Sequence, residues 1–235
     1  MNTPNHIKLA LGIPSLGHWE ADFGFALCQM CVYMSAALFE EGQSREVLFL
    51  DKRTSNLPRS RQECIEDALL QDCTHLLFLD TDQSFPMDVA HRLIRWKKPV
   101  VACNIPLKTV PSFPTARQRG PTPFGIPIYS NSTSNPMGLE KVWRVGSGVM
   151  MIDLSILKDK NEKGEVKIPK PWFELRYSDK HQQFVGEDWY FCKKVEDAGY
   201  DIYIDHDLSR HIGHVGNFRY THAHIPQMQE EAQAA

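Results

Sequence analysis

The first hundred residues alternate between short apolar runs and longer amphipathic segments. The run at 75–80 shows no polar alternation, which is typical of a strand buried on both faces of a parallel sheet, and the runs at 7–13 and 46–51 predict two more strands. The intervening segments, 23–42 and 57–73, are long enough for helices, and a glycine ends the first while a proline lies in the first turn of the second. This alternation predicts a doubly wound α/β sheet.

The same pattern extends through the rest of the chain. A helix near 87–96 and a strand at 100–103 follow, and later a Gly-Ser-Gly at 146–148 separates two apolar runs. A helix is expected over 185–200 and a last strand over 201–205. The apolar residues of the second helix that should pack on the sheet are Cys64, Ile65, Ala68 and Leu69. A chain of 235 residues with this pattern can form one large domain.

One segment breaks the alternation. Residues 105–137 contain seven prolines and a polar tract, which predicts a long irregular loop. Such loops in compact domains usually serve a function, so we expect a mobile lid beside the site where a substrate binds. Its basic residues Lys108, Arg117 and Arg119 would then face an anionic substrate such as DNA. The chain closes with a polar tail at 226–235.

Composition narrows the choice of function. The net charge of -3 gives no general basic surface, so strong non-specific binding of nucleic acid is not indicated, although a local basic groove remains open. The six cysteines are scattered, which indicates reduced thiols. Cys28 and Cys31 fall inside a helix, and a second pair is absent, so neither a redox motif nor a zinc ribbon is expected. Without a signal peptide or a membrane span, we expect a cytoplasmic protein.

Candidate chemistry begins where the strand at 75–80 ends. Asp80 and Asp82 are one residue apart, so in an extended segment their carboxylates point the same way and can approach one cation. Open α/β sheets bind their ligands at this edge. The alternative is a strand-ending turn whose acids are merely solvated.

Three other groups of residues bear on this choice. Arg59 and Arg61 lie in the first turn of a helix, where a positive charge is unfavourable unless an anion such as a diphosphate docks there. The alternative is that both side chains point into solvent. Glu187 and Asp188 begin another helix, where they either cap it or supply a general base and an orienting group. The last group is His211 and His214, which lie beside glycines and are candidate metal ligands.

The order of these features resembles that of GT-A-type glycosyltransferases. The stretches that carry the resemblance are "RSRQ", "FLDTD", "GSGVMMID", "GEDWYFCKKVEDAGY" and "HIGHVG". The resemblance covers roughly 7–216 and is greatest to the short forms found among phage and bacterial proteins. One departure is that many relatives carry Arg-Asn where this chain has Arg61-Gln62, which bears on the nucleotide contact there.

The resemblance implies a single GT-A-like, Rossmann-type domain over 1–225, with a mostly parallel sheet flanked by helices. Residues 1–103 would form the nucleotide-binding half and 104–225 the acceptor-side half. The implied reaction is the metal-dependent transfer of a sugar from a nucleotide-diphosphate sugar, with a UDP-sugar favoured. The acceptor hydroxyl would belong to a glycan, a small molecule or modified phage DNA, and a phage-encoded enzyme would act in the host cytoplasm.

The resemblance also implies a role for each candidate residue. Asp82 would coordinate Mn²⁺ or Mg²⁺, and Asp80 would hold the nucleotide ribose or a metal-bound water. His214 would complete the metal shell, with His211 as its alternate. Asp188, or Glu187, would be the acceptor-side carboxylate. The remaining assignments place Pro14 and Ser15 in the base pocket and Arg59 and Arg61 near the diphosphate.

Two other functions compete with this one. A nucleotidyltransferase can share the fold, but it would place a basic, glycine-rich loop after the first strand, and "GIPSLGHWEADFG" contains neither Lys nor Arg. A zinc-stabilised binding module would instead use five histidines near the end of the chain: His206, His211, His214, His222 and His224. Tight stoichiometric zinc without affinity for a nucleotide sugar would favour the module.

Overall fold

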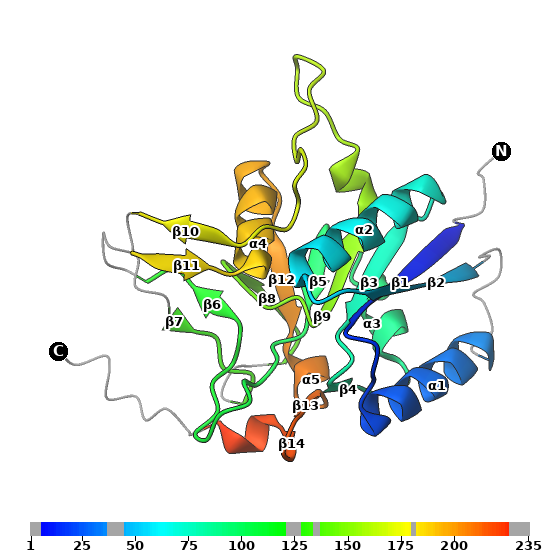
Figure 1. The fold of residues 1–235 in the computed structure, drawn as a ribbon, viewed down its shortest axis with the longest axis vertical. Helices are drawn as coiled ribbons and strands as arrows, with labels where there is room; N and C mark the ends of the chain where they lie inside the picture. Colours follow the sequence, from blue (N-terminus) through cyan, green and yellow to red (C-terminus); the bar gives the residue numbers. More distant parts are fainter. Residues whose placement is uncertain (1–5, 37–44, 121–127, 134–136, 180–181, 226–235) are drawn as a thin grey trace.

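The computed structural model describes residues 6–36, 45–120, 128–133, 137–179 and 182–225. Their centre is a seven-stranded sheet in the order β2-β1-β3-β9-β5-β12-β8 (Figure 1). Five strands run in one direction: β1 (Ile7–Ser15), β2 (Arg45–Arg53), β3 (His75–Leu79), β5 (Val100–Ala102) and β12 (Ile202–Asp205). The two antiparallel strands are β9 (Val149–Asp153) and β8 (Leu139–Val142). The expected α/β class with a mostly parallel sheet is therefore confirmed.

Helices cover both faces of this sheet. The longer ones are α1 (Ala21–Ala36), α2 (Leu57–Leu70), α3 (Val89–Arg95) and α4 (Glu187–Asp197), and a short α5 spans His206–Ser209. The core on one face includes residues of α2 and α4, and the core on the other includes residues of α1 and α3. In α2, Cys64, Ile65 and Ala68 are fully buried and Leu69 packs against them, so the predicted sheet-facing side of this helix is confirmed.

Smaller elements lie around the main sheet. A three-stranded sheet joins β4 (Gln83–Ser84), β13 (Gly213–Val215) and β14 (Arg219–Tyr220). Two hairpins pair β6 (Arg117–Gln118) with β7 (Ile128–Tyr129), and β10 (Arg176–Ser178) with β11 (Gln183–Val185). Two short 3₁₀ helices are η1 (Leu154–Leu157) and η2 (His222–His224). The pairing of β13 with β4 sets residues near the C-terminal end of the described chain beside the end of β3.

Element ends differ modestly from the sequence-based expectation. The helix expected near 87–96 begins at Val89 and ends at Arg95, and α4 is shorter than the predicted 185–200. The second helix ends at Leu70 because Asp72 has a left-handed backbone, with φ of 53°, that stops it before Cys73. The predicted stop of the first helix at Gly42 and the tail at 226–235 lie outside the described residues.

The described part of the proline-rich segment combines an irregular path with two short strands and several buried side chains. It contains β6 and β7, and the side chains of Ser112 and Ala116 are buried within it. Buried Asn104 organises it, since its side-chain nitrogen donates to the Ser130 carbonyl at 2.7 Å and its oxygen accepts from the Ala116 N–H at 2.9 Å. The described part is therefore largely irregular, as predicted, and the hydrogen bonds of Asn104 hold its backbone, while the expected mobility of the segment stays a prediction.

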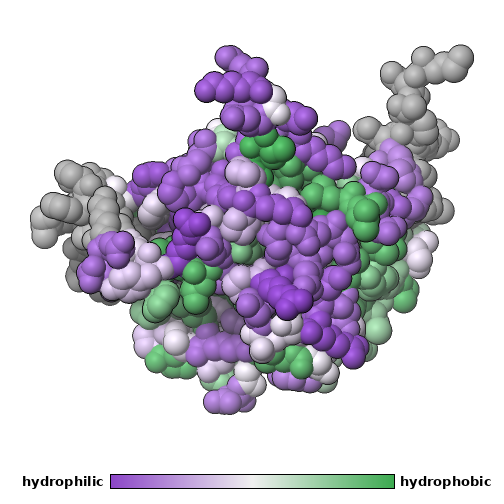
Figure 2. Space-filling model, turned by 45° about the horizontal axis from the view of Figure 1, so that its top comes forward, coloured by the Kyte–Doolittle hydropathy of each residue, from purple (hydrophilic) through white to green (hydrophobic). Residues whose placement is uncertain are grey.

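The surface is mostly polar, with one apolar side. Phe25 and Val32 of α1 and Val47 and Phe49 of the edge strand β2 are all exposed. Figure 2 shows apolar surface gathered on the right of the view, the side on which Figure 1 places α1 and β2. Within the described residues, every helix is too short or too polar to cross a bilayer.

Candidate active site

The candidate site forms where strands and helices meet at one edge of the sheet. Asp80 directly follows β3, and its N–H donates to the Gly148 carbonyl at 2.9 Å, which fixes the turn leading into β9. Arg61 comes from the N-terminal part of α2 and Glu187 from the first turn of α4. The two side chains contact each other beside Asp80. The predicted position of the site, outside the carboxyl end of a buried strand, is the place where these residues come together.

Arg61 is the buried centre of this cluster. Its side chain is 2% exposed, and one guanidinium nitrogen donates to both oxygens of Asp80, at 2.9 and 3.0 Å. Its Nε lies 3.6 Å from Glu187 Oε1, and the rings of Phe78 and Phe173 lie 5.2 and 5.9 Å from the guanidinium carbon. Burial lowers the pKa of Arg61, but Asp80 and Glu187 outweigh it and the net shift is upward, so the guanidinium stays charged.

The two arginines expected near a diphosphate separate in space. Arg61 turns inward to the protein's own carboxylates, whereas the Arg59 side chain is 70% exposed and pairs with Glu63 at 2.7 Å. Residues two apart on a helix point about 200° away from each other, which is why one is buried and the other solvated. The structure therefore does not bring Arg59 into the cluster.

Asp82 forms a second group with residues from two distant segments. Its Oδ2 lies 2.7 Å from Lys108 Nζ and 3.3 Å from His214 Nε2, while its Oδ1 accepts from the Gln83 side chain at 3.1 Å. Burial raises the pKa of Asp82, but the hydrogen bonds from His214 and Lys108 outweigh it and hold that pKa well below its usual range. The carboxylate is therefore ionised at neutral pH.

The orientation of His214 bears on cation binding. Its Nδ1 lies 2.9 Å from the Pro106 carbonyl, which can only accept, so Nδ1 carries the hydrogen. When Nε2 also carries a hydrogen, it donates to Asp82 Oδ2; when the ring is neutral, Nε2 instead presents a lone pair to the carboxylate, and those two electron-rich atoms fit a shared cation. One oxygen and one nitrogen ligand with open positions suit Mn²⁺ or Mg²⁺.

The other predicted metal ligands lie elsewhere. Both Asp80 oxygens bond to Arg61, and His211 is exposed, with its N–H donating to the Leu208 carbonyl. Over the ranges that the structure describes, no group of three or more His, Cys, Asp or Glu side chains could hold a metal ion.

Asp188 is a largely buried carboxylate with a raised pKa. It lies in the first turn of α4, where its Oδ1 accepts from the Trp189 N–H at 2.7 Å. Burial, together with the neighbouring charge of Glu187, raises the pKa of Asp188 to about 6. Such a carboxylate is ionised at neutral pH yet is more basic than an ordinary aspartate, which matches the requirement for accepting a proton near pH 7.

The nucleoside end of the predicted site is less defined. Ser15 is buried, its hydroxyl accepts from the Gly17 N–H at 2.8 Å, and its carbonyl accepts from Thr54. An open groove of about 720 Å³ lies at the N-terminal end of α2, lined by residues 55–59, Gln62 and 173–175. Pro14 and Ser15 end β1 and are not among its lining residues, so their role in a base pocket stays a prediction.

Two features of the site carried little or no signal in the sequence. Lys108 reaches Asp82 from the proline-rich segment, and a lysine in such a segment gave no indication of this partner. Gly148 approaches Asp80 closely, since a Cβ there would lie 3.0 Å from Asp80 Oδ2 and 2.9 Å from Ile105 Cδ1. The Gly-Ser-Gly motif was the available sequence signal for the close approach at Gly148, because glycine is needed where a backbone meets another group closely.

We expect Gly148→Ala to destabilise the fold by about 1–3 kcal/mol, because the added methyl group overpacks Asp80 and Ile105. Urea unfolding monitored by circular dichroism would measure it. Gly24→Ala is the matched control, since that helical position has nothing within 4 Å and alanine should stabilise it by about 0.5–1 kcal/mol. Equal changes in the two variants would contradict the close approach at Gly148.

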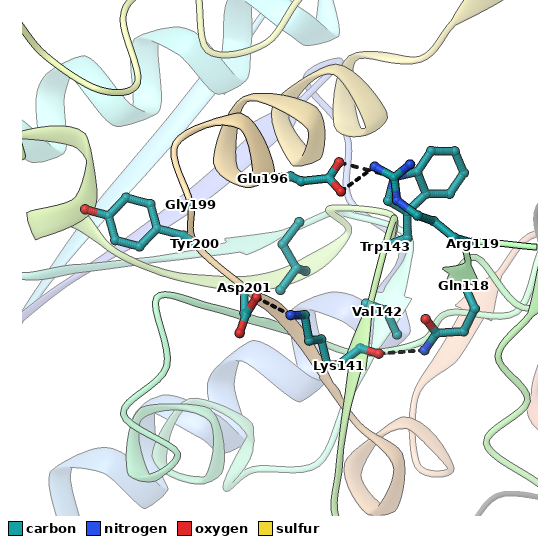
Figure 3. A pocket seen from close by; sticks show the side chains of 10 residues that line it. Gln118, Arg119, Lys141, Val142, Trp143, Glu196, Gly199, Tyr200 and Asp201 are labelled. Atoms are coloured by element: carbon teal, nitrogen blue, oxygen red, sulfur yellow. Dashed lines mark hydrogen bonds and ion pairs between the residues drawn. The ribbon is translucent and has the colours of Figure 1, made fainter. Parts of the chain in front are cut away.

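A separate pocket of about 470 Å³ lies at the C-terminal end of α4, beside β8 and the start of β12 (Figure 3). Its charged side chains are largely paired with one another. Arg119 bonds to Glu196 and Lys141 bonds to Asp201 at 2.6 Å, while the Trp143 Nε1–H donates to Glu196 at 3.2 Å. The pocket therefore presents a neutralised surface and takes no part in the cluster around Arg61.

The other three histidines of the zinc-module alternative, His206, His222 and His224, are bonded individually. His206 Nδ1 lies 3.0 Å from the Ser132 hydroxyl, and His222 Nε2 lies 2.7 Å from the Asn104 carbonyl. His224 Nδ1 accepts from the Thr221 N–H at 3.0 Å. Each has its own polar partner, and the described residues contain no metal-binding cluster, which counts against the zinc-stabilised module.

No protein-family model and no curated protein matches this sequence. Among solved structures, the chain is similar to A197 from STIV, with a TM-score of 0.58 and 17% identity over 95% of this chain and 98% of that one. The catalytic domain of Drosophila beta1,4galactosyltransferase 7, in complex with xylobiose, gives a TM-score of 0.48 and 12% identity over 90% of this chain and 71% of that one. The likeness to A197 shows a shared fold.

Proposed function

We propose that this protein is a glycosyltransferase that moves a sugar from a nucleotide-diphosphate sugar, with a UDP-sugar favoured, to an acceptor hydroxyl in a reaction that needs Mn²⁺ or Mg²⁺. The observation that carries the proposal is that Asp82 and Asp188, two carboxylates with different surroundings, lie in the region where β3 ends and α4 begins. Asp82 with His214 forms a ligand pair suited to a cation, and Asp188 is a carboxylate with its pKa raised to about 6. Leaving-group stabilisation and proton removal are the two tasks that sugar transfer sets.

In this mechanism Asp188 accepts the proton of the acceptor hydroxyl as the acceptor oxygen bonds to the anomeric carbon. The bond from that carbon to the diphosphate breaks, and its electron pair leaves with the diphosphate. Asp82 and His214 would hold the divalent cation, which when bound supplies Lewis-acid neutralisation of the leaving group. Arg61 fixes Asp80 and Glu187 beside the reacting groups, so that the site is organised before substrate enters.

Binding of UDP tests the donor half of the proposal. UDP and Mn²⁺ together should raise the free energy of unfolding, by about 2.7 kcal/mol at a ligand concentration a hundredfold above Kd. Asp82→Asn should abolish this increment, because one of the two cation ligands loses its charge. The measurement is thermal unfolding of each variant with and without both ligands.

Asp197→Asn is the control, since Asp197 is exposed and pairs with Lys193 at the other end of α4. It should keep the whole increment. Equal increments in wild type and Asp82→Asn would remove Asp82 from the site, and the absence of any increment with a panel of nucleotides would reject the transferase function.

A further inference from the structure

Lys108 occupies the carboxylate oxygen that a cation would need. Its Nζ lies 2.7 Å from Asp82 Oδ2, and the same oxygen lies 3.3 Å from His214 Nε2. The ammonium therefore already neutralises the half of the Asp82 carboxylate that faces His214. The second carboxylate oxygen is occupied by the Gln83 side chain.

The backbone around Lys108 is anchored, whereas its side chain has room to move. The Leu107 N–H donates to the Phe113 carbonyl at 2.8 Å, the Ser112 hydroxyl donates to the Leu107 carbonyl at 2.7 Å, and Pro106 accepts from His214. The Lys108 side chain is 35% exposed. A lysine stem has four rotatable bonds, so the ammonium can leave Asp82 while the backbone stays in place.

A lysine and a divalent cation do not share one carboxylate oxygen stably, because like charges at that separation repel in a partly buried site. A released ammonium would remain within reach of whatever anion the cation brings with it. A diphosphate offers several acceptor oxygens, and lysine binds phosphate as a point charge.

We propose that Lys108 is a counter-ion of Asp82 that a divalent cation displaces, and that the released ammonium then binds the diphosphate of the nucleotide. The first half depends only on the contacts of Asp82. The second half rests on the proposed function. The exchange would let Asp82 remain neutralised both with and without the cation.

The experiment compares wild type with Lys108→Met, which keeps the stem and removes the charge. Mn²⁺ binding alone is measured by the electron paramagnetic resonance signal of free Mn²⁺, and UDP binding at saturating Mn²⁺ by calorimetry. Loss of the competing charge should tighten Mn²⁺ binding about tenfold, and loss of the charged hydrogen bond should weaken UDP binding about tenfold. These effects have opposite signs, which a change in folding would not produce.

Two further variants sharpen the result. Lys108→Arg keeps the competing charge and should leave Mn²⁺ affinity within about twofold of wild type, since a charge-conserving change retains the repulsion. Lys163→Met, in the exposed loop between η1 and β10, should change neither affinity. Far-UV circular dichroism verifies that all variants are folded.

Each outcome tests one half of the proposal. If Lys108→Met binds Mn²⁺ no more tightly than wild type does, or if neither protein binds Mn²⁺, the proposed role of Lys108 as the displaced counter-ion is wrong. Tighter Mn²⁺ binding with unchanged UDP affinity overturns the diphosphate contact alone. Tighter Mn²⁺ binding by a protein that binds no nucleotide supports the counter-ion while rejecting the proposed function, so the two failures are distinguishable.

Discussion

Asp188→Asn should lower turnover about 10²–10⁴-fold, equivalent to roughly 3–5 kcal/mol of barrier, while donor binding stays nearly intact. An amide cannot accept the acceptor proton, whereas the ligands of the cation and diphosphate are other residues. Transfer rates with a donor found by nucleotide screening, together with UDP affinity, measure both quantities. The wild-type rate should also fall below about pH 6, because burial beside Glu187 raises the pKa of Asp188 to about 6.

The same substitution should stabilise the fold at pH 8. A carboxyl whose pKa is raised on folding favours the native state when it is protonated, so this contribution is present below the ordinary pKa and is lost as pH rises toward 6. An uncharged asparagine escapes that cost at pH 8. Helix capping by Asp188 predicts the opposite, a loss of about 1 kcal/mol with turnover retained.

Glu187→Gln is the control for this prediction. Its partner Arg61 would lose one carboxylate neighbour, so this variant should be less stable than wild type but should retain more activity than Asp188→Asn. If both variants transfer sugar at the wild-type rate and only melt earlier, Asp188 is a cap and the catalytic role is rejected. If Glu187→Gln alone loses turnover, the base is Glu187.

Arg61→Met should cost about 3–5 kcal/mol of stability, the largest effect on folding that we expect from one substitution. Removing the guanidinium leaves Asp80 and Glu187 without their shared counter-ion, in a site where Arg61 is 2% exposed. Urea unfolding at pH 7.5 gives the free energy. The loss should shrink when Asp80→Asn is added, because the stranded charge is then removed.

Arg59→Met is the matched control, two residues away on the same helix. Its exposed pair with Glu63 should contribute about 0–1 kcal/mol. Similar losses from both arginines would mean that burial does not distinguish them, and the account of Arg61 as the centre of the cluster would fail.

The local pattern of apolar and polar residues predicted much of the fold. The continuous apolar run of β3 predicted a buried strand because no polar residue interrupts Leu76–Leu79, and the apolar stripe of α2 identified its sheet-facing side. The acidic residues at the end of β3 could be placed at the ligand-binding edge because a parallel sheet puts its carboxyl ends together.

Long-range pairing could not be predicted from the same rules. His214 lies beside Asp82 because β13 pairs with β4, across more than a hundred residues of chain. The direction of Arg61 depends on Asp80 and Glu187 being within reach, and helical position alone predicted an outward arginine equally well. Lys108 reaches Asp82 from a turn that is held by hydrogen bonds between Leu107, Ser112 and Phe113, none of which the local sequence pattern predicts.

The position of β9 has a consequence for how the chain acquires its structure. This strand lies between β3 and β5 in the sheet, although it follows both in the sequence. A nascent chain that has emerged as far as β5 therefore has a gap in its sheet, with two strand edges whose N–H and C=O groups lack partners. The sheet closes only after β9 has been synthesised, so folding has a high contact order and the early chain depends on late residues. We therefore expect a fragment that ends before β9 to expose these two strand edges and to aggregate.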